Sequence, residues 1–320
     1  MAEAQPRVAI VGSANVDFIV RSEHLPGPGE TVTGGELVSA GGGKGANQAV
    51  AAHRLGAHVS FVARVGDDGP GKQTLEGFAR EGLGTSLIVR DPDVATGVAL
   101  ILVDRLGQNM ISVALGANQR LSVRDVERAE REIGSARVLL TQLEIPIGTV
   151  RAALTFAKRR GLTTVLNPAP ATDVPDDVLA EVDWLTPNES EATRLVGFPV
   201  IDPESAVQAG RQLLTRGPKW VVITLGSQGA IAASDDEVIE LPPFVVTAVD
   251  ATAAGDAFSA ALCVGLARGW PAARTMRFAS AAGALTTTRV GAQPSLPTDD
   301  EVFNFLETTP AVRWSGRNGG

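Results

Sequence analysis

Short apolar runs alternate with longer helix-like segments along most of this chain, and this alternation is the feature that most constrains its fold. We predict strands at residues 7–11, 59–63, 138–141, 163–166, 184–186 and 221–224. We predict helices at residues 45–55, 257–267 and 272–285, and a short helix after Thr298, which forms a capping box with Glu301. The pattern is typical of an α/β fold in which helices cover both faces of a mainly parallel sheet.

Two segments, residues 15–39 and 96–114, interrupt this alternation. They are rich in Val, Ile, Thr and Gly, and residues 98–103 and 110–113 flank a turn as the two arms of a hairpin would. We expect the two segments to form one small β-sheet that projects from an α/β core made of residues 1–14, 40–95 and 115–309. Residues 310–320 are predicted to be a flexible tail.

Composition argues against several classes of protein. Of the 320 residues, 44% are hydrophobic, and the net charge is −8, so the basic surface that a general nucleic-acid or membrane-surface binder needs is missing. Cys263 is the only cysteine, which excludes an internal disulfide and a zinc site of paired cysteines. We recognise neither a signal peptide nor a membrane-spanning run, and we expect a cytoplasmic location.

A loop that opens a helix carries the strongest chemical signal. Residues 250–256, Asp-Ala-Thr-Ala-Ala-Gly-Asp, lead into the apolar run 257–262. Unpaired amides at a helix N-terminus attract anions, and Gly255 would let a phosphate approach the backbone. Asp256 would be the carboxylate beside that anion, suited to accept a proton from an attacking hydroxyl. The alternative is an ordinary acidic first turn, which the helix dipole also favours.

Two further segments carry candidate ligand-binding residues. Asn15 and Asp17 would point to the same side of an extended segment, where they would suit the vicinal hydroxyls of a sugar. The glycines at 41–43 permit close approach of the backbone to a ligand, and Asn47 offers a hydrogen-bonding amide. The alternatives are an Asx-turn pair and a flexible turn before a helix.

Residues 66–73 have the spacing of a phosphate-binding loop but not its chemistry. Gln73 stands where such a loop needs a hydroxyl for Mg²⁺, and the adjacent Asp67 and Asp68 make a poor phosphate cradle. We therefore reject this segment as a nucleotide site.

Two further loops suit a nucleotide. Asn188 and Glu191 would organise Mg²⁺ and phosphate through water, although a capping box explains the same pair. Gly226 and Gly229 follow a predicted strand, in a turn that would lie against a nucleotide or would simply close a hairpin.

In their order along the chain, these motifs resemble the PfkB family of carbohydrate kinases. The resemblance rests on Asn-x-Asp at 15–17, Gly-Gly-Lys-Gly-Ala-Asn-Gln at 42–48, Gly-Asp-Asp at 66–68, Asn-Pro-Ala-Pro at 167–170, Thr-Pro-Asn-Glu at 186–189, Thr-Leu-Gly-Ser-x-Gly at 224–229 and Ala-Ala-Gly-Asp-Ala-Phe at 253–258. It covers roughly residues 7 to 306 and implies a parallel α/β sheet, a β lid and a sugar bound between them. Residues 28–34 and 291–295 further resemble the members that phosphorylate ribose.

The resemblance implies a role for each matching residue. Asp256 would be the catalytic base, and the amides of Ala254, Gly255 and Asp256 would form an anion hole. The sugar site would comprise Asn15, Asp17, Gly43, Lys44, Asn47 and Glu144, with Lys44 either offsetting charge on the transferred group or supporting the loop. ATP would contact Asn188, Glu191, Thr224, Gly226, Ser227, Gly229, Gly255 and Ser280. A monovalent cation, K⁺, would lie beside Asp250, Thr252, Thr286, Arg289, Gly291 and Ser295.

The implied activity is phosphorylation of the 5-hydroxyl of D-ribose by ATP with Mg²⁺, in a homodimer whose lids clasp. A kinase of the same fold for 2-deoxyribose, a nucleoside or another sugar such as fructose is the first alternative. Asn15 and Asp17 favour a polar pentose, because a nucleoside base would need stacking partners that a lid poor in aromatic residues lacks. A non-catalytic sugar sensor is the second alternative, and it would not need Asp256 beside an anion hole.

Overall fold

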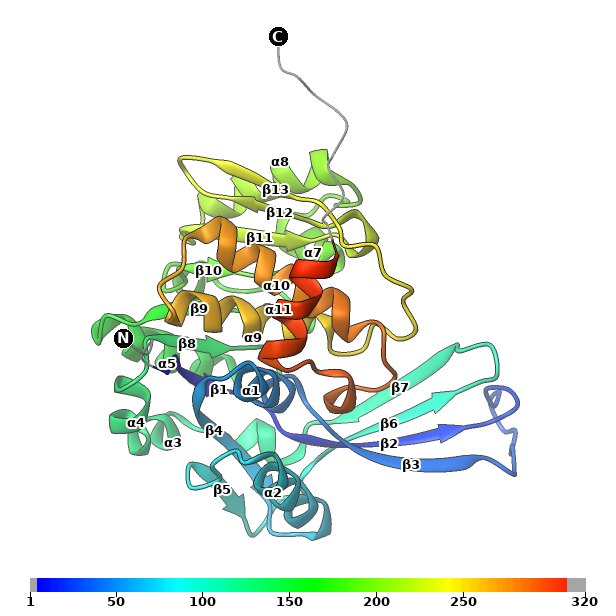
Figure 1. Ribbon diagram of the computed structural model, residues 1–320. Coiled ribbons are helices and arrows are strands. Elements are labelled where there is room, and N and C mark those ends of the chain that lie inside the picture. Colours follow the sequence, from blue (N-terminus) through cyan, green and yellow to red (C-terminus); the bar gives the residue numbers. More distant parts are fainter. Residues whose placement is uncertain (1–4, 310–320) are drawn as a thin grey trace.

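In the computed structural model, which describes residues 5–309, a nine-stranded sheet forms the centre of the protein (Figure 1). Its strands are β1 (Arg7–Val11), β4 (His58–Gly66), β5 (Ile88–Asp91), β8 (Val138–Thr141), β9 (Thr163–Leu166), β10 (Trp184–Leu185), β11 (Trp220–Thr224), β12 (Ala230–Ala233) and β13 (Val238–Leu241). Their order is β13-β12-β11-β10-β9-β8-β1-β4-β5. Neighbours from β11 to β5 are parallel, and β12 and β13 add an antiparallel edge.

Helices cover both faces of this sheet. One layer contains α1 (Lys44–Arg54), α2 (Gly69–Glu81), α9 (Ala254–Ala267), α10 (Ala272–Thr286) and α11 (Asp299–Thr308). The other contains α3 (Val123–Arg128), α4 (Glu130–Gly134), α5 (Ile147–Arg159), α6 (Asp176–Leu179), α7 (Glu189–Val196) and α8 (Pro203–Leu214). Side chains of β1 alternate between the layers: Val8 and Ile10 join the first apolar cluster, and Ala9 and Val11 join the second.

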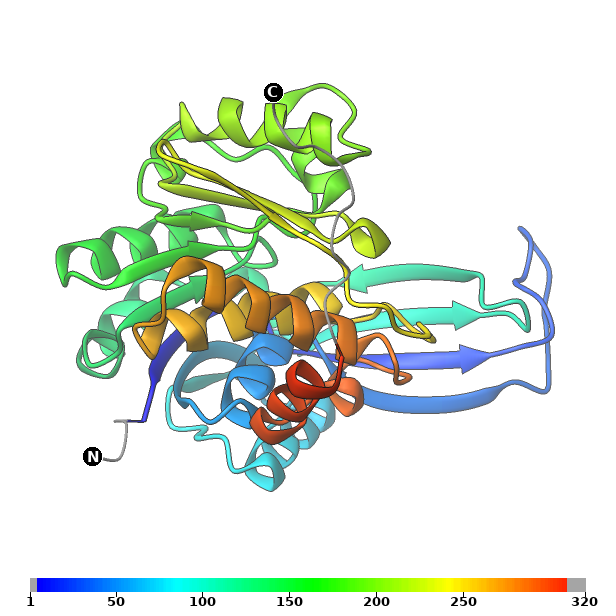
Figure 2. The same cartoon turned by 45° about the horizontal axis from the view of Figure 1, so that its top comes forward.

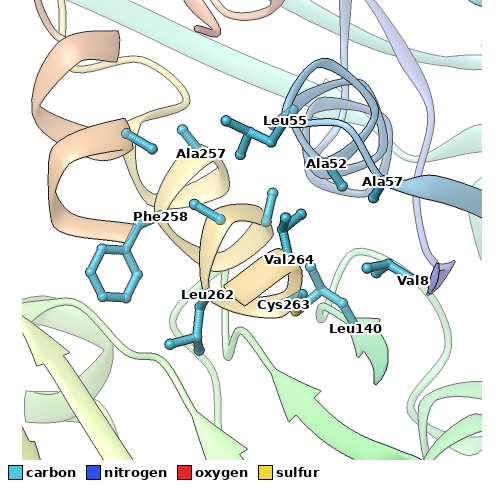
Figure 3. Close-up of a cluster of buried hydrophobic side chains, with 14 of the residues drawn as sticks. Val8, Ala52, Leu55, Ala57, Leu140, Ala257, Phe258, Leu262, Cys263 and Val264 are labelled. Atoms are coloured by element: carbon cyan, nitrogen blue, oxygen red, sulfur yellow. The ribbon is translucent and has the colours of Figure 1, made fainter. Parts of the chain in front are cut away.

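Helix α9 lies within the first cluster, surrounded by apolar side chains (Figure 3). Leu262, Cys263 and Val264 are fully buried there. Cys263 is fully buried, which raises the pKa of its thiol, so this cysteine is a small core residue. Because α9 is packed on all sides, its N-terminus has a fixed position relative to the sheet.

The lid is a separate four-stranded sheet that extends away from the core (Figures 1 and 2). Its strands are β2 (Asn15–Arg21), β3 (Glu36–Gly42), β6 (Gly97–Val103) and β7 (Asn109–Ala114), in the order β3-β2-β6-β7. Strands β2 and β6 are parallel, with Asn15 opposite Gly97 and Asp17 opposite Ala99. The predicted lid and its hairpin, β6–β7, are confirmed.

Most predicted elements are present, with shifted ends. Helix α9 begins at Ala254, three residues before the predicted start, because Ala253 adopts a left-handed turn with φ of 62°. The capping box of Thr298 and Glu301 is confirmed at the start of α11. Short 3-10 helices η1 (Gly116–Arg120), η2 (Gly226–Gln228) and η3 (Gln293–Ser295) complete the described elements. The predicted tail, 310–320, lies outside the described residues. Between residues 5 and 309, no helix has the length and apolar character needed to cross a membrane.

Candidate active site

The N-termini of α1 and α9 meet at one place, near the base of the lid. Asn47 of α1 donates a hydrogen bond from Nδ2 to Asp256 Oδ2 at 2.9 Å, although the two residues are 209 positions apart in the chain. Gln48 donates from Nε2 to the other oxygen, Oδ1, at 3.0 Å. The structure therefore joins the glycine-rich segment at 41–47 to the predicted anion-binding turn through one carboxylate.

Asp256 lies in the first turn of α9 and is only 5% exposed. Burial raises its pKa, the charge of Lys44 and the two amide hydrogen bonds lower it, and the net effect leaves the pKa above its ordinary value. The two amides fix the direction of the carboxylate. Asp256 is thus an oriented proton acceptor that is more basic than an exposed aspartate.

The first turn of α9 has two amides that are unpaired among the described residues. The Ala254 amide, one of the three predicted donors, instead donates to the carbonyl of Ala251 at 3.2 Å. Within the described part of the chain, no carbonyl accepts from the amides of Gly255 and Asp256. Gly255 is exposed, and a Cβ built on it would meet no described atom within 4 Å, so the start of α9 is open beside this residue. Unpaired amides at an exposed helix start are a favourable place for an anion.

The glycines before α1 let the lid strand β2 lie close to the helix. A Cβ on Gly42 would be 2.2 Å from the carboxylate oxygens of Asp17, so any other residue there would have to displace this carboxylate. Gly43 has φ of 86°, and a Cβ there would be 2.8 Å from the backbone nitrogen of Asn15. The packing therefore brings Asn15 and Asp17 next to the start of α1.

Asp17 is half-buried beside a second carboxylate, that of Glu144. Desolvation and, to a smaller extent, the charge of Glu144 raise the pKa of Asp17 to about 6. Glu144 accepts hydrogen bonds from Ser13 Oγ at 2.6 Å and from the Lys44 amide at 3.0 Å. No residue between 5 and 309 donates a hydrogen bond to the Asp17 carboxylate, so it can accept one from a ligand hydroxyl.

Lys44 is the first residue of α1 and lies among carboxylates from three other parts of the chain. Burial acts to lower its pKa, but the charges of Asp256, Glu144 and Glu191 outweigh burial and raise it. Lys44 therefore keeps its positive charge at neutral pH. It links the predicted sugar side, at Glu144, to the predicted nucleotide side, at Glu191.

Asn188 and Glu191 form the capping box at the start of α7. Asn188 Oδ1 accepts from the Glu191 amide, and Glu191 Oε2 accepts from the Asn188 amide, both at 2.9 Å. Burial is the largest influence on the pKa of Glu191, which is raised. The capping explanation is correct, and the nucleotide role of this pair stays a prediction.

The turn between β11 and β12 lies next to this cap, because Asn188 and Thr224 form a parallel bridge. Gly226 and Ser227 belong to the exposed 3-10 turn η2, and Gly229 follows it, so the segment does close a hairpin. Ser280, on α10, has a buried hydroxyl that makes no hydrogen bond with a described residue.

The two predicted cation loops are joined through Asp250. Its Oδ1 accepts from the amide and hydroxyl of Thr252, and its Oδ2 accepts from the Gly291 amide at 2.8 Å. Burial alone would raise the pKa of Asp250, but these hydrogen bonds and the charge of Arg21 outweigh it and lower the pKa. The loops therefore share one ionised carboxylate at neutral pH.

Three other predicted cation residues use their side chains elsewhere. Arg289 pairs with Glu301 at 2.5 Å, Thr286 Oγ1 donates to the Ala282 carbonyl, and Ser295 Oγ donates to the Ala292 carbonyl. A guanidinium does not ligate a cation, so Arg289 has only its backbone carbonyl to offer.

Several polar residues of the site were missed from the sequence. Gln48 donates hydrogen bonds to both Asp256 and Asn167. The sequence did offer a signal for it, because Gln48 is a polar residue inside α1 that does not cap the helix. Asn118, on η1, accepts from the Ala14 amide at 2.9 Å and donates to Asn15 Oδ1 at 2.7 Å. Nothing local marks Asn118, because its partners lie more than 100 positions away.

Comparisons with known proteins agree with this geometry. Residues 5–299 match the model of a family described as pfkB family carbohydrate kinase. The ribokinase of Haemophilus influenzae is 41% identical over 300 residues, which cover 94% of this chain and 98% of that protein. The deoxyribokinase of Salmonella typhimurium is 34% identical over 300 residues, which cover 93% and 98%.

The structure of Arabidopsis thaliana ribokinase complexed with ribose and ATP has a TM-score of 0.87 and 33% sequence identity, covering 95% of this chain and 99% of that one. Both the sequence match and the fold therefore extend over the α/β core and the lid. This chain belongs to the PfkB family of carbohydrate kinases.

Proposed function

We propose that this chain transfers the γ-phosphoryl group of ATP to the 5-hydroxyl of D-ribose. The observation that carries the proposal is the position of Asp256, a buried carboxylate oriented by Asn47 and Gln48 at an open anion-binding turn. The ribokinase relatives near 40% identity, and the plant ribokinase complexed with ribose and ATP, support the choice of substrates.

Asp256 accepts the proton of the 5-hydroxyl as that oxygen attacks the γ-phosphorus and the bond to the ADP oxygen breaks. The unpaired amides of Gly255 and Asp256 stabilise negative charge on the transferred group. Lys44 adds a fixed positive charge between the two substrates. The remaining contribution is positioning, because phosphoryl transfer needs its reactants aligned and shielded from water.

The proposed sugar site contains hydrogen-bond acceptors to which no described residue donates. Asn47 Oδ1 is buried and unpartnered among the described residues, and the Asp17 carboxylate also receives no hydrogen bond there. Sugar hydroxyls donate to such groups, and the amide of Asn15 can bind a neighbouring hydroxyl. We place ribose between β2 of the lid and the start of α1.

Mg²⁺ and K⁺ are part of the proposal. Mg²⁺ supplies charge neutralisation on the phosphates of ATP, and Asn188 and Glu191 would reach it through water. The ionised carboxylate of Asp250 joins the two loops and supplies the negative charge that a monovalent cation needs, and backbone carbonyls of the same loops would complete its ligands. By holding the Asp250–Gly291 contact, K⁺ would steady the turn that carries Gly255.

We further propose a homodimer formed through the lid. Exposed apolar side chains lie on both faces of the lid: Val38, Ile111 and Val113 on the face that carries Asp17, and Leu37, Leu100 and Met110 on the other. An apolar surface of this kind on a projecting sheet is a typical protein interface, and a second lid is the complementary surface. Sedimentation that gives a monomer at working concentration would contradict this part.

The activity is tested by ADP release from the purified protein with Mg-ATP, comparing D-ribose with 2-deoxy-D-ribose, each in K⁺ and in Na⁺ buffer. We expect turnover that prefers ribose and is faster in K⁺. A preference for deoxyribose would assign the activity of the more distant deoxyribokinase relative instead. Sugar binding without turnover in either K⁺ or Na⁺ buffer would favour the alternative of a non-catalytic sugar sensor.

A further inference from the structure

The segment at 66–73, which we rejected as a phosphate site, connects the core to the lid. Asp68 is the N-cap of α2, and its Oδ1 accepts from the Gly71 amide at 2.8 Å. The same carboxylate also binds Thr96, the residue immediately before lid strand β6. Thr96 Oγ1 donates to Oδ1 at 2.6 Å, and the Thr96 amide donates to Oδ2 at 2.9 Å.

Thr96 is 2% exposed, and its hydroxyl also accepts from the Gly66 amide at 2.8 Å, at the end of β4. One threonine is therefore held by a side chain and a backbone group of the core. The packing around it is tight, because a Cβ on Gly71 would be 2.1 Å from the Gly66 carbonyl oxygen and 2.8 Å from Thr96 Oγ1. The start of β6 has little freedom to move while these contacts exist.

The next residue, Gly97, lies directly against the sugar side of the site. A Cβ on Gly97 would be 2.2 Å from Asn15 Oδ1 and 2.4 Å from Asn118 Nδ2. Gly97 pairs with Asn15 in the parallel β2–β6 ladder, and Ala99 pairs with Asp17. A displacement of Thr96 would therefore move Asn15 and Asp17 relative to α1.

We propose that Asp68 is a positioning residue for sugar binding, which acts by fixing the first residue of β6 so that Asn15 and Asp17 face the glycine-rich end of α1. The inference rests on the proposed function, because it assigns Asn15 and Asp17 to the sugar. It gives Asp68, the last residue of the Gly-Asp-Asp motif at 66–68, a mechanical role in the reaction instead of a role in phosphate binding.

Asp68→Asn is the sharpest test, because it changes one atom and keeps a good N-cap. The amide oxygen can still accept from Gly71 and the Thr96 hydroxyl. Its nitrogen then faces the Thr96 amide, so a charge-assisted hydrogen bond becomes a contact between two donors. The matched control is Asp67→Asn, which removes only an exposed ion pair with Arg90.

The experiment measures KM and kcat for ribose and for ATP in both variants, together with amide hydrogen exchange of residues 97–103 without substrates. For Asp68→Asn we expect the ribose KM to rise at least tenfold, the ATP KM to change less than twofold, and exchange at 97–103 to increase. Asp67→Asn is expected to change each quantity less than twofold. Thr96→Val should reproduce the Asp68→Asn result, and Thr96→Ser, which keeps the hydroxyl, should retain a nearly normal ribose KM.

A purely structural role would reduce the active fraction and leave the ribose KM unchanged, and that outcome would overturn the proposal. Equal effects on the ribose and ATP KM values would also overturn it. If the parent protein turned over no ribose, the proposed function would fail, and hydrogen exchange would decide the Asp68 contact separately. Unchanged exchange at 97–103 in Asp68→Asn would then show that Asp68 does not hold the lid strand.

Discussion

Replacing Asp17 with asparagine should stabilise the ligand-free protein while it weakens sugar binding. The folded protein raises the pKa of Asp17 from 3.8 to about 6 through desolvation and the charge of Glu144. Folding therefore disfavours the ionised form of Asp17. With 1.36 kcal/mol for each pKa unit, ionisation of this carboxyl costs about 3 kcal/mol of stability when it is complete. Asparagine has nearly the same shape and carries no charge.

The sign of the pH dependence follows from the raised pKa. The protonated carboxyl of Asp17 contributes to the free energy of unfolding. This contribution is fully present below pH 3.8 and is lost as the pH rises through about 6. The advantage of Asp17→Asn should therefore grow from about 0.5 kcal/mol at pH 4 to about 1.5 kcal/mol at pH 5 and about 3 kcal/mol above pH 7.

Urea unfolding of both proteins between pH 5 and pH 8, without sugar, measures this difference. Asp236→Asn is the matched control, because Asp236 is an exposed aspartate in the β12–β13 turn and should change stability by less than about 0.5 kcal/mol. A variant that is no more stable than the parent at pH 8, or an advantage that does not grow with pH, would refute the reasoning.

The same carboxylate predicts the pH dependence of sugar binding. Sugar hydroxyls can donate to the ionised form of Asp17, so binding should stabilise that form and weaken as the pH falls through about 6. Calorimetric titration with ribose from pH 5 to pH 8 should show this decline for the parent. In Asp17→Asn, affinity should be low and nearly independent of pH.

Three further perturbations test other parts of the site. Asp256→Asn should leave ATP binding intact and lower kcat by about two to four powers of ten, the usual contribution of a general base. Single-turnover kinetics measure the chemical step directly, and an unchanged rate in this variant would contradict the role of Asp256. Gly43→Ala should cost at least about 1 to 2 kcal/mol in urea unfolding, because of the φ of 86° and the approach of Asn15, whereas Gly84→Ala, with no described atom within 4 Å of the new Cβ, should not. Asp250→Asn should abolish any difference in activity and melting temperature between K⁺ and Na⁺ buffers. If the variant still preferred one cation, the cation would bind at a site other than Asp250.

The local pattern of the sequence was sufficient for the layers of the fold. Strands at 7–11, 138–141 and 163–166 agree with β1, β8 and β9 residue by residue, because a parallel strand covered on both faces is a short run of mainly apolar and β-branched residues. The lid was predictable for the opposite reason, since residues 15–39 and 96–114 offer no apolar face for a helix. Caps are local as well, so the boxes at Asn188 and Thr298 were also predictable.

The motifs at 15–17, 42–48 and 253–258 named most of the candidate site, but they did not reveal how its members contact each other. The hydrogen bonds from Asn47 and Gln48 to Asp256 cross more than 200 positions of the chain, and no periodicity encodes them. The pairing of Asn118 with Asn15, and of Asp68 with Thr96, depends in the same way on which strands become neighbours.

The sequence by itself thus determined which residue types lie in loops at strand ends, because turn chemistry and strand burial act over a few neighbouring residues. Only the tertiary structure decided which of these groups share a site and how they are charged. It set the raised pKa of Asp17 and the positive charge of Lys44, because desolvation and the distance between charges depend on packing between elements. It also joined Asp68, within the segment 66–73 that we rejected as a nucleotide site, to the lid through Thr96, because a hydrogen bond forms only when folding brings donor and acceptor together.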